Sequence, residues 1–262
     1  MIIVAGRLSA LIFVLLSFAI FYLYMYLAKR GKKIVIRRLA AMEAIPEAIG
    51  RAAELGKPAV FATGIGYGGT LSDSISGAEI LSGINIMGYA ARLSANKGSD
   101  LWVYTPIVDS IPLIEETLRN SYLLEGKPEL FNPTHIRINP TQSSHLSAYL
   151  GFLQREVPAS CIFIGGILFE AVVMGEAGNT IGAMQISGTA NVFQIPFLVA
   201  STDYTLIMEE VYAAGAMTHP NPDSLGTLYG EDIIKFILLA LLVIGVLLAF
   251  GRQTLLIDLL KM

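Results

Sequence analysis

Three glycines, Gly64, Gly66 and Gly69, have the spacing G-x-G-x-x-G, the pattern in this sequence that most directly suggests chemistry. They follow the apolar run PAVFAT and precede a segment expected to be helical. In dinucleotide-binding folds such glycines permit a tight turn, close approach of a pyrophosphate and close packing of helix on strand. The same glycines also suit a plain strand-to-helix turn, so both interpretations stay open.

Three features depart from the dinucleotide pattern. The helix is expected to start several residues after the glycines, beyond LSDS, so that its N-terminus stands away from the loop. The next strand also begins later than usual, and it ends at Thr105-Pro106 without an acid to hold a ribose. We therefore interpret the loop first as a turn or contact surface. The candidate ligand-binding residues are Gly64, Gly66, Gly69, Thr70, Gly165 and Gly166.

Small and hydroxyl-bearing residues follow the other expected strands. These stretches are Asn139-Pro140-Thr141, Gly165-Gly166, Ser187-Gly188-Thr189 and Ser201-Thr202-Asp203. Ligands of open α/β sheets bind outside the carboxyl ends of the strands, but helix caps and turns use the same residue types. We favour caps and turns.

Known catalytic and metal-binding patterns are missing from the sequence. It has no P-loop motif and no G-x-S-x-G, and His135, His145 and His219 fit no metal spacing. We expect His145, beside Ser143 and Ser144, to face solvent or cap a helix, and Cys161 to fill the core. The sequence thus predicts no catalytic residue, no metal and no cofactor, and it favours a protein that is not an enzyme.

The composition indicates a membrane protein. Apolar residues make up 54% and charged residues 15% of the 262 residues, below the roughly 25% charged residues of typical soluble domains. A net charge of -3 offers no basic field for nucleic acid, so no nucleic-acid partner is expected. Residues 8–28 carry no charge and residues 233–250 form a second apolar run.

A cluster of cationic residues predicts the topology. Six lysines and arginines lie within residues 29–38, whereas Arg7 alone precedes the first span. The positive-inside rule therefore places both termini outside the inner membrane and the domain between the spans in the cytoplasm. The expected domains are an N-terminal anchor with its basic flank (1–33), an α/β domain (34–224) and a C-terminal transmembrane helix with a short tail (225–262).

Helices and apolar strands alternate between the two spans. Expected strands cover 58–63, 100–105, 135–139, 159–165, 183–188 and 196–201, and expected helices include 46–56, 74–96, 112–124, 143–156 and 203–214. This alternation predicts a doubly wound, mostly parallel, Rossmann-like sheet tethered by two transmembrane helices. The helix over 74–96 is apolar on most sides. It is covered either by a second subunit or, as a central helix, by its own domain.

Three stretches together resemble an uncharacterised prokaryotic family of membrane-anchored Rossmann-like α/β proteins. They are AMEAIPEAIGRAAELGKPAVFATGIG, GYAARLSANKGSDLWV and ASTDYTLIMEEVYAAGAMT. The resemblance covers most of residues 40–218. It implies an architecture and a prokaryotic setting, and it assigns no catalytic residue.

Two functions remain to be compared. The first is a non-catalytic scaffold or assembly subunit that forms a homo-oligomer, or joins a larger complex, at the lipid bilayer. The second is a small-ligand or nucleotide-binding domain, with or without enzymatic activity, that uses the Gly64–Gly69 loop.

Overall fold

The computed structural model describes residues 8–31, 37–66, 68–72 and 76–250. The chain divides into two compact units. One unit combines Met1–Val35 with Pro220–Met262, and the other is Ile36–His219.

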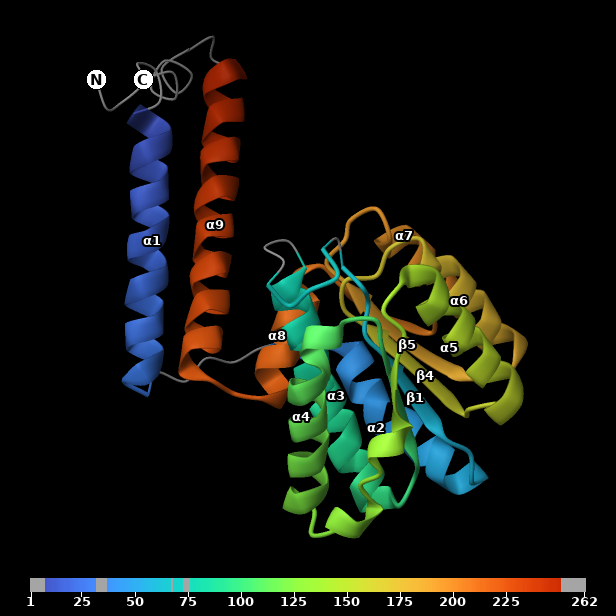
Figure 1. The fold of residues 1–262 in the computed structure, drawn as a ribbon. Coiled ribbons are helices and arrows are strands. Elements are labelled where there is room, and N and C mark those ends of the chain that lie inside the picture. The colour runs from blue at the N-terminus through green and yellow to red at the C-terminus, as the bar shows by residue number, and fades with distance from the viewer. Residues whose placement is uncertain (1–7, 32–36, 67, 73–75, 251–262) are drawn as a thin grey trace. The chain divides into compact units, whose positions relative to one another are not determined.

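The first unit contains two long helices, α1 (Leu8–Lys29) and α9 (Pro222–Phe250), which pack side by side (Figure 1). They run antiparallel, because Lys29 pairs with Asp223 at 2.7 Å while Phe21 lies against Gly230. A Cβ atom on Gly226 would lie 2.6 Å from the Cα of Met25. Glycine therefore allows the two helix backbones to approach closely, as small residues do between membrane helices.

Helix α1 is, among the described residues, the one helix that is long and apolar enough to cross a membrane, judged by length and composition. Its mean hydropathy over the best window is 2.3. A second span at 233–250, which we expected, is not established by this criterion. Part of the predicted basic cluster, including Lys32 and Lys33, and the predicted tail from residue 251 lie outside the described residues.

The second unit is an α/β domain built on a parallel sheet. Within the described residues the sheet has six strands in the order β3-β2-β1-β4-β5-β6, and each of the five neighbouring pairs is parallel. The strands are β1 (Ala59–Ala62), β2 (Leu101–Thr105), β3 (Ile136–Ile138), β4 (Ser160–Ile164), β5 (Met184–Thr189) and β6 (Tyr204–Ile207). This is the strand order of the Rossmann fold, with the reversal between β1 and β4.

Helices cover both faces of the sheet, which confirms the predicted α/β class (Figure 1). The first face carries α2 (Ala40–Leu55), α3 (Gly77–Lys97), α4 (Ile111–Leu124) and α8 (Glu209–Thr218). The second face carries α5 (Gln142–Glu156), α6 (Glu170–Thr180) and α7 (Ile195–Ser201). Alternate strand residues enter the two cores, since Phe61 packs on the first face and Val60 and Ala62 pack on the second.

Helix α3 is the central helix of the first face. It packs against α2, α4 and α8 as well as the sheet, and a narrow stripe including Leu81, Asn85 and Arg92 remains exposed. Ile80, Ile84, Ile86 and Met87 are fully buried within the domain. The domain itself therefore covers the apolar sides of this helix, so the helix gives no reason to invoke a second subunit.

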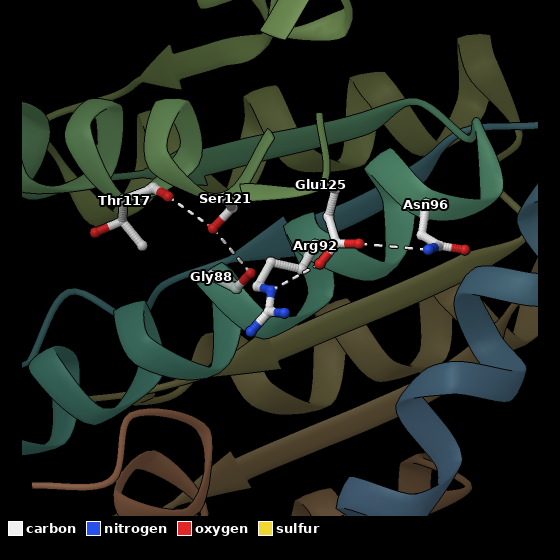
Figure 2. Close-up of polar contacts among 6 residues, drawn as sticks. All are labelled: Gly88, Arg92, Asn96, Thr117, Ser121 and Glu125. Carbon is white, nitrogen blue, oxygen red and sulfur yellow. Dashed lines mark hydrogen bonds and ion pairs between the residues drawn. The ribbon is translucent and has the colours of Figure 1, made fainter. Parts of the chain in front are cut away.

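Polar contacts join α3 to the C-terminal half of α4 and to Glu125 just after it (Figure 2). The Ser121 hydroxyl lies 3.1 Å from the Gly88 carbonyl oxygen and 2.7 Å from that of Thr117. Arg92 Nε donates to Glu125 at 2.9 Å, and this hydrogen bond is the main reason that the pKa of Glu125 is lowered. A Cβ atom on Gly88 would lie 2.8 Å from Thr117, so the two helices approach closely at this glycine.

Three predicted elements are wrong in kind or extent. Residues 196–201, predicted as a strand, form helix α7 with Pro196 in its first turn. The start of the predicted helix 203–214 is instead strand β6, and α8 begins at Glu209. The parallel pairing of β5 with β6 explains both errors, because a parallel connection needs a crossover helix between its strands. Helix α2 begins at Ala40, which places Pro46 inside the helix rather than in its first turn.

Candidate functional site

The candidate site is the point where the strand order reverses, at the carboxyl ends of β1 and β4. Gly64 and Gly66 follow β1, and Gly165 and Gly166 follow β4. The Gly66 N–H donates to the Gly166 carbonyl oxygen at 2.6 Å. Four of the six predicted ligand-binding residues therefore come together in space.

These glycines allow the two loops to touch. A Cβ atom on Gly64 would lie 2.3 Å from the Gly166 carbonyl carbon, and one on Gly166 would lie 2.6 Å from the Cα of Gly66. No side chain fits at such distances. The loop-to-loop contact thus explains the glycines at 64 and 166 without a ligand.

The start of α3 also returns to the glycine loop. The helix begins at Gly77, eight residues past Gly69, which agrees with the predicted late start. A Cβ atom on Gly66 would nevertheless lie 2.1 Å from the Ser76 hydroxyl oxygen. The expectation that the helix N-terminus stands away from the loop is therefore wrong, because Ser76, directly before the helix, lies against Gly66.

Gly69 and Thr70 do not join this cluster. Gly69 has a φ of +65°, and a Cβ atom placed on it would meet nothing within 4 Å. The Thr70 hydroxyl lies 3.2 Å from that of Ser72 in an exposed position. The predicted six-residue site therefore separates into a packed part of four glycines and an open part of two residues.

The hydroxyl groups at the strand ends largely bind one another. Thr63 donates to Thr105 at 2.9 Å, and Thr105 lies 3.2 Å from the Ser110 hydroxyl. Ser187 and Thr202 form a similar pair at 2.8 Å. These pairs are neither caps nor turns, whereas Thr141 of the predicted rim does cap a helix, because its hydroxyl accepts from the Ser144 N–H at the start of α5.

A buried carboxyl group lies beside the glycine loops on the first face. Glu79, in the first turn of α3, accepts hydrogen bonds from the Thr189 hydroxyl at 2.7 Å and the Ala190 N–H at 2.6 Å. Desolvation raises the pKa of Glu79, and the two hydrogen bonds partly oppose this shift. The group connects α3 to the end of β5 and can hold or release a proton there.

A second buried polar group lies on the other face, at the N-terminal turns of α5 and α6. Gln142 Nε2 donates to Glu170, while the other carboxylate oxygen of Glu170 has no partner among the described residues. His145, one helical turn after Gln142, is buried and neither ring nitrogen has a partner in the same set of residues. Desolvation lowers the pKa of His145 to about 4, so the imidazole is neutral at pH 7.

The burial of His145 corrects the expectation that this side chain faces solvent or caps a helix. The signal was the spacing of His145, Tyr149 and Phe152, which puts all three on one side of α5. The buried side chains of Glu79 and Glu170 were also missed. Each is the acidic residue in the first turn of its helix, where carboxylates are favoured, and this position was the available signal.

His145 and Glu170 each present buried polar atoms that a water molecule or a small polar ligand could satisfy. Within the described residues, no group of three or more His, Cys, Asp or Glu side chains could hold a metal ion. The geometry supplies hydrogen-bonding groups and does not by itself specify a reaction.

Comparison with known proteins identifies a family. No curated protein matches the chain. One family model, described as a domain of unknown function (DUF6754), matches residues 2–259. This match confirms the predicted relation to an uncharacterised family, and the chain belongs to the DUF6754 family.

Proposed function

We propose that the protein crosses a prokaryotic inner membrane twice and that its cytoplasmic α/β domain assembles with a second copy without catalysing a reaction. The apolar surface and length of α1 support the first span. The second span is supported by α9, which packs along α1 and exposes Phe236, Leu242 and Leu247. Lys29 and Lys235 would then lie near the cytoplasmic interface.

The observation that carries the assembly proposal is an exposed apolar surface on the second face. We call it the α6–α7 patch; it consists of Phe169, Val172, Val173, Val192, Phe193 and Phe197. Phe193 is 78% exposed and Phe169 is 61% exposed, although α6 and α7 pack against each other. Large apolar side chains exposed together on neighbouring elements are a common feature of interaction surfaces. Val172 and Val173 also line a groove with Leu153 of α5, so the patch borders α5 as well.

A second copy is the partner that the proposed anchoring favours. Copies held in one bilayer meet at high effective concentration, so a modest apolar contact is enough for association. We therefore assign the assembly contact to the α6–α7 patch and not to α3, because the apolar sides of α3 are covered within the domain.

Crosslinking and native mass measurement in mild detergent test the assembly proposal. We expect a dimer or higher oligomer for the full chain, and we expect Phe193→Asp combined with Phe197→Asp to convert it to monomer. Leu55→Asp is the matched control, because Leu55 is 56% exposed but lies at the end of α2, on the first face. A strict monomer at high concentration, or equal loss with the control, contradicts the proposal.

Cysteine labelling tests the proposed topology. The natural Cys161 is buried, so single cysteines introduced at Lys57 and Gln253 report separately on the domain and the tail. We expect a membrane-impermeant maleimide added to intact cells to label Gln253→Cys but not Lys57→Cys. The reverse pattern contradicts the cytoplasmic placement.

Ligand binding at the strand-order reversal is the second candidate function. Both nitrogens of His145 and one oxygen of Glu170 are buried without a partner among the described residues, which favours it. Thermal-shift measurements with nucleotides and dinucleotides test it. A saturable rise in melting temperature that His145→Leu removes and Thr70→Val leaves unchanged would support a ligand at this buried group.

A further inference from the structure

A cleft opens on the second face of the sheet, away from the glycine loops. Its floor is formed by β2 and β3, and its wall is the C-terminal half of α5. The cleft has a volume of about 640 Å³, within the range of small-molecule sites. It exists because β3 is an edge strand and α5 lies to one side of it.

Aromatic side chains form the body of the cleft. Trp102 and Tyr104 point to the same face of β2, and Phe152 of α5 lies 5.2 Å from the Trp102 ring centre and 5.4 Å from that of Tyr104. Tyr104 is opposite Arg137 in the β2–β3 register. The Arg137 guanidinium carbon accordingly lies 5.2 Å from the centre of the Trp102 ring.

The cleft also carries two arginines. Arg137 from β3 and Arg155 from α5 line it, and in the described parts of the chain neither forms an ion pair. Burial raises the pKa of Tyr104, while the nearby charges of both arginines act to lower it. Glu156, which also lines the cleft, offsets one of the two positive charges.

A polar acceptor completes the lining. The side-chain oxygen of Asn139, directly after β3, is buried and has no hydrogen-bond partner among the residues described. Buried polar atoms are normally paired, and a water molecule or a group entering the cleft can supply the missing donor.

We propose that this cleft binds a small organic anion in which a phosphate or carboxylate is attached to a flat aromatic body. The guanidinium groups of Arg137 and Arg155 bind the anion, because their planar forks match carboxylate and phosphate oxygens. The aromatic body packs against the part of Trp102 that His135, stacked on it with ring centres 4.2 Å apart, leaves uncovered. Tyr104 and Phe152, which are 4% and 2% exposed, form the base of the cleft beneath it. The site is independent of the assembly proposal, because it does not include the α6–α7 patch.

The sequence supplies its own probe, since Trp102 is the single tryptophan of the chain. The full chain in detergent micelles is titrated with adenosine monophosphate, benzoate, adenosine and inorganic phosphate while tryptophan emission is recorded. We expect saturable changes with adenosine monophosphate or benzoate, and the stronger of the two distinguishes a phosphate from a carboxylate ligand. Adenosine and inorganic phosphate, which carry the body and the anion alone, are expected to bind at least about tenfold more weakly.

Arginine variants test the assigned contacts. Arg137→Gln and Arg155→Gln are each expected to raise the Kd about tenfold. The matched control is Arg119→Gln, because Arg119 is also exposed but pairs with Glu115 on α4. Circular dichroism melts verify that all three variants are folded.

Three outcomes would overturn the proposal. One is the absence of a saturable emission change with any probe up to millimolar concentration. Another is binding of adenosine or of inorganic phosphate as tight as that of the two aromatic anions. The third is an equal loss of affinity in Arg119→Gln, which would point to a general charge effect.

Discussion

The two faces of the sheet differ in how completely their helices are covered. On the first face α3 is apolar on most sides, and its neighbours α2, α4 and α8 bury those sides, although Leu123 and Leu124 at the end of α4 are 59% and 72% exposed. On the second face α6 and α7 leave large apolar side chains exposed, and the edge beside β3 remains open as a cleft. An apolar helix therefore marks an interaction surface only where the domain supplies no neighbour, and the second face meets that condition.

The largest effect is expected from a substitution in the buried helix α3 of the first face. Ile84 is 1% exposed in the middle of α3, and Ile84→Ala leaves a cavity between α3 and the core. We expect the free energy of unfolding to fall by about 3–4 kcal/mol. Urea denaturation of the full chain in detergent, followed by circular dichroism, measures this change. A loss near that of an exposed position would mean that α3 is not buried as described.

The next largest effect is expected from a comparison of two glycine substitutions, one in the packed part and one in the open part of the glycine loop. Gly64→Ala forces a Cβ atom into the Gly166 backbone, so we expect a loss of about 3 kcal/mol in the free energy of unfolding. In Gly69→Ala the new Cβ atom meets no atom within 4 Å, but alanine must adopt the positive φ of this position. We therefore expect a loss of about 1 kcal/mol in the free energy of unfolding. The same denaturation experiment compares the two variants. Equal losses would contradict the contact between the β1 and β4 loops.

A pH effect is expected on the second face, where His145 is buried. Its folded pKa of about 4 lies below the unfolded value of 6.5, so the unfolded chain binds a proton first as the pH falls. The stability due to neutral His145 is present above pH 6.5 and is lost as the pH falls toward 4.

Between pH 7 and pH 5 this linkage lowers the free energy of unfolding by about 2 kcal/mol. His145→Leu should remove that part of the pH dependence, which denaturation at both pH values measures. Glu79, whose raised pKa acts in the opposite direction, is present in both proteins and cancels in the comparison. An unchanged pH profile in His145→Leu would show that the imidazole is not the titrating group.

The smallest effect is expected in the exposed patch. Val172 is 42% exposed on α6 in the single chain. In the Phe193→Asp/Phe197→Asp background, which the assembly proposal expects to be monomeric, Val172→Ala should change the free energy of unfolding by no more than about 0.5 kcal/mol. Ile84→Ala measured in the same background gives the contrast between a buried and an exposed position directly. A loss above about 2 kcal/mol for Val172→Ala in this monomer would mean that Val172 is buried within its own domain.

The alternating helices and apolar strands were sufficient to predict the α/β class and the parallel sheet. The same patterns failed at residues 196–214. The stretch PFLVAS is as apolar as a strand, and it is a helix only because it connects two parallel strands. The candidate site was predicted only in part. The spacing of Gly64 and Gly66 was visible in the sequence, but their contact with Gly166 depends on β1 and β4 being neighbours.

The cleft was not predicted for a similar reason. Trp102, Arg137 and Arg155 are far apart in the sequence and match no motif. They meet because β2 pairs with β3 in one register and α5 returns across the sheet beside them. Such a site follows from tertiary pairing and has no local signature.

The contact between Lys29 and Asp223 has a consequence for how the chain is organised. These residues lie at the ends of two antiparallel helices that already touch along the glycines of α9, so the α/β domain is in effect an insertion into the turn of a helical hairpin. Replacing the insertion by a short loop should leave a hairpin that still pairs. Conversely, a break in the domain backbone would not release either half, because the hairpin would keep the two fragments together.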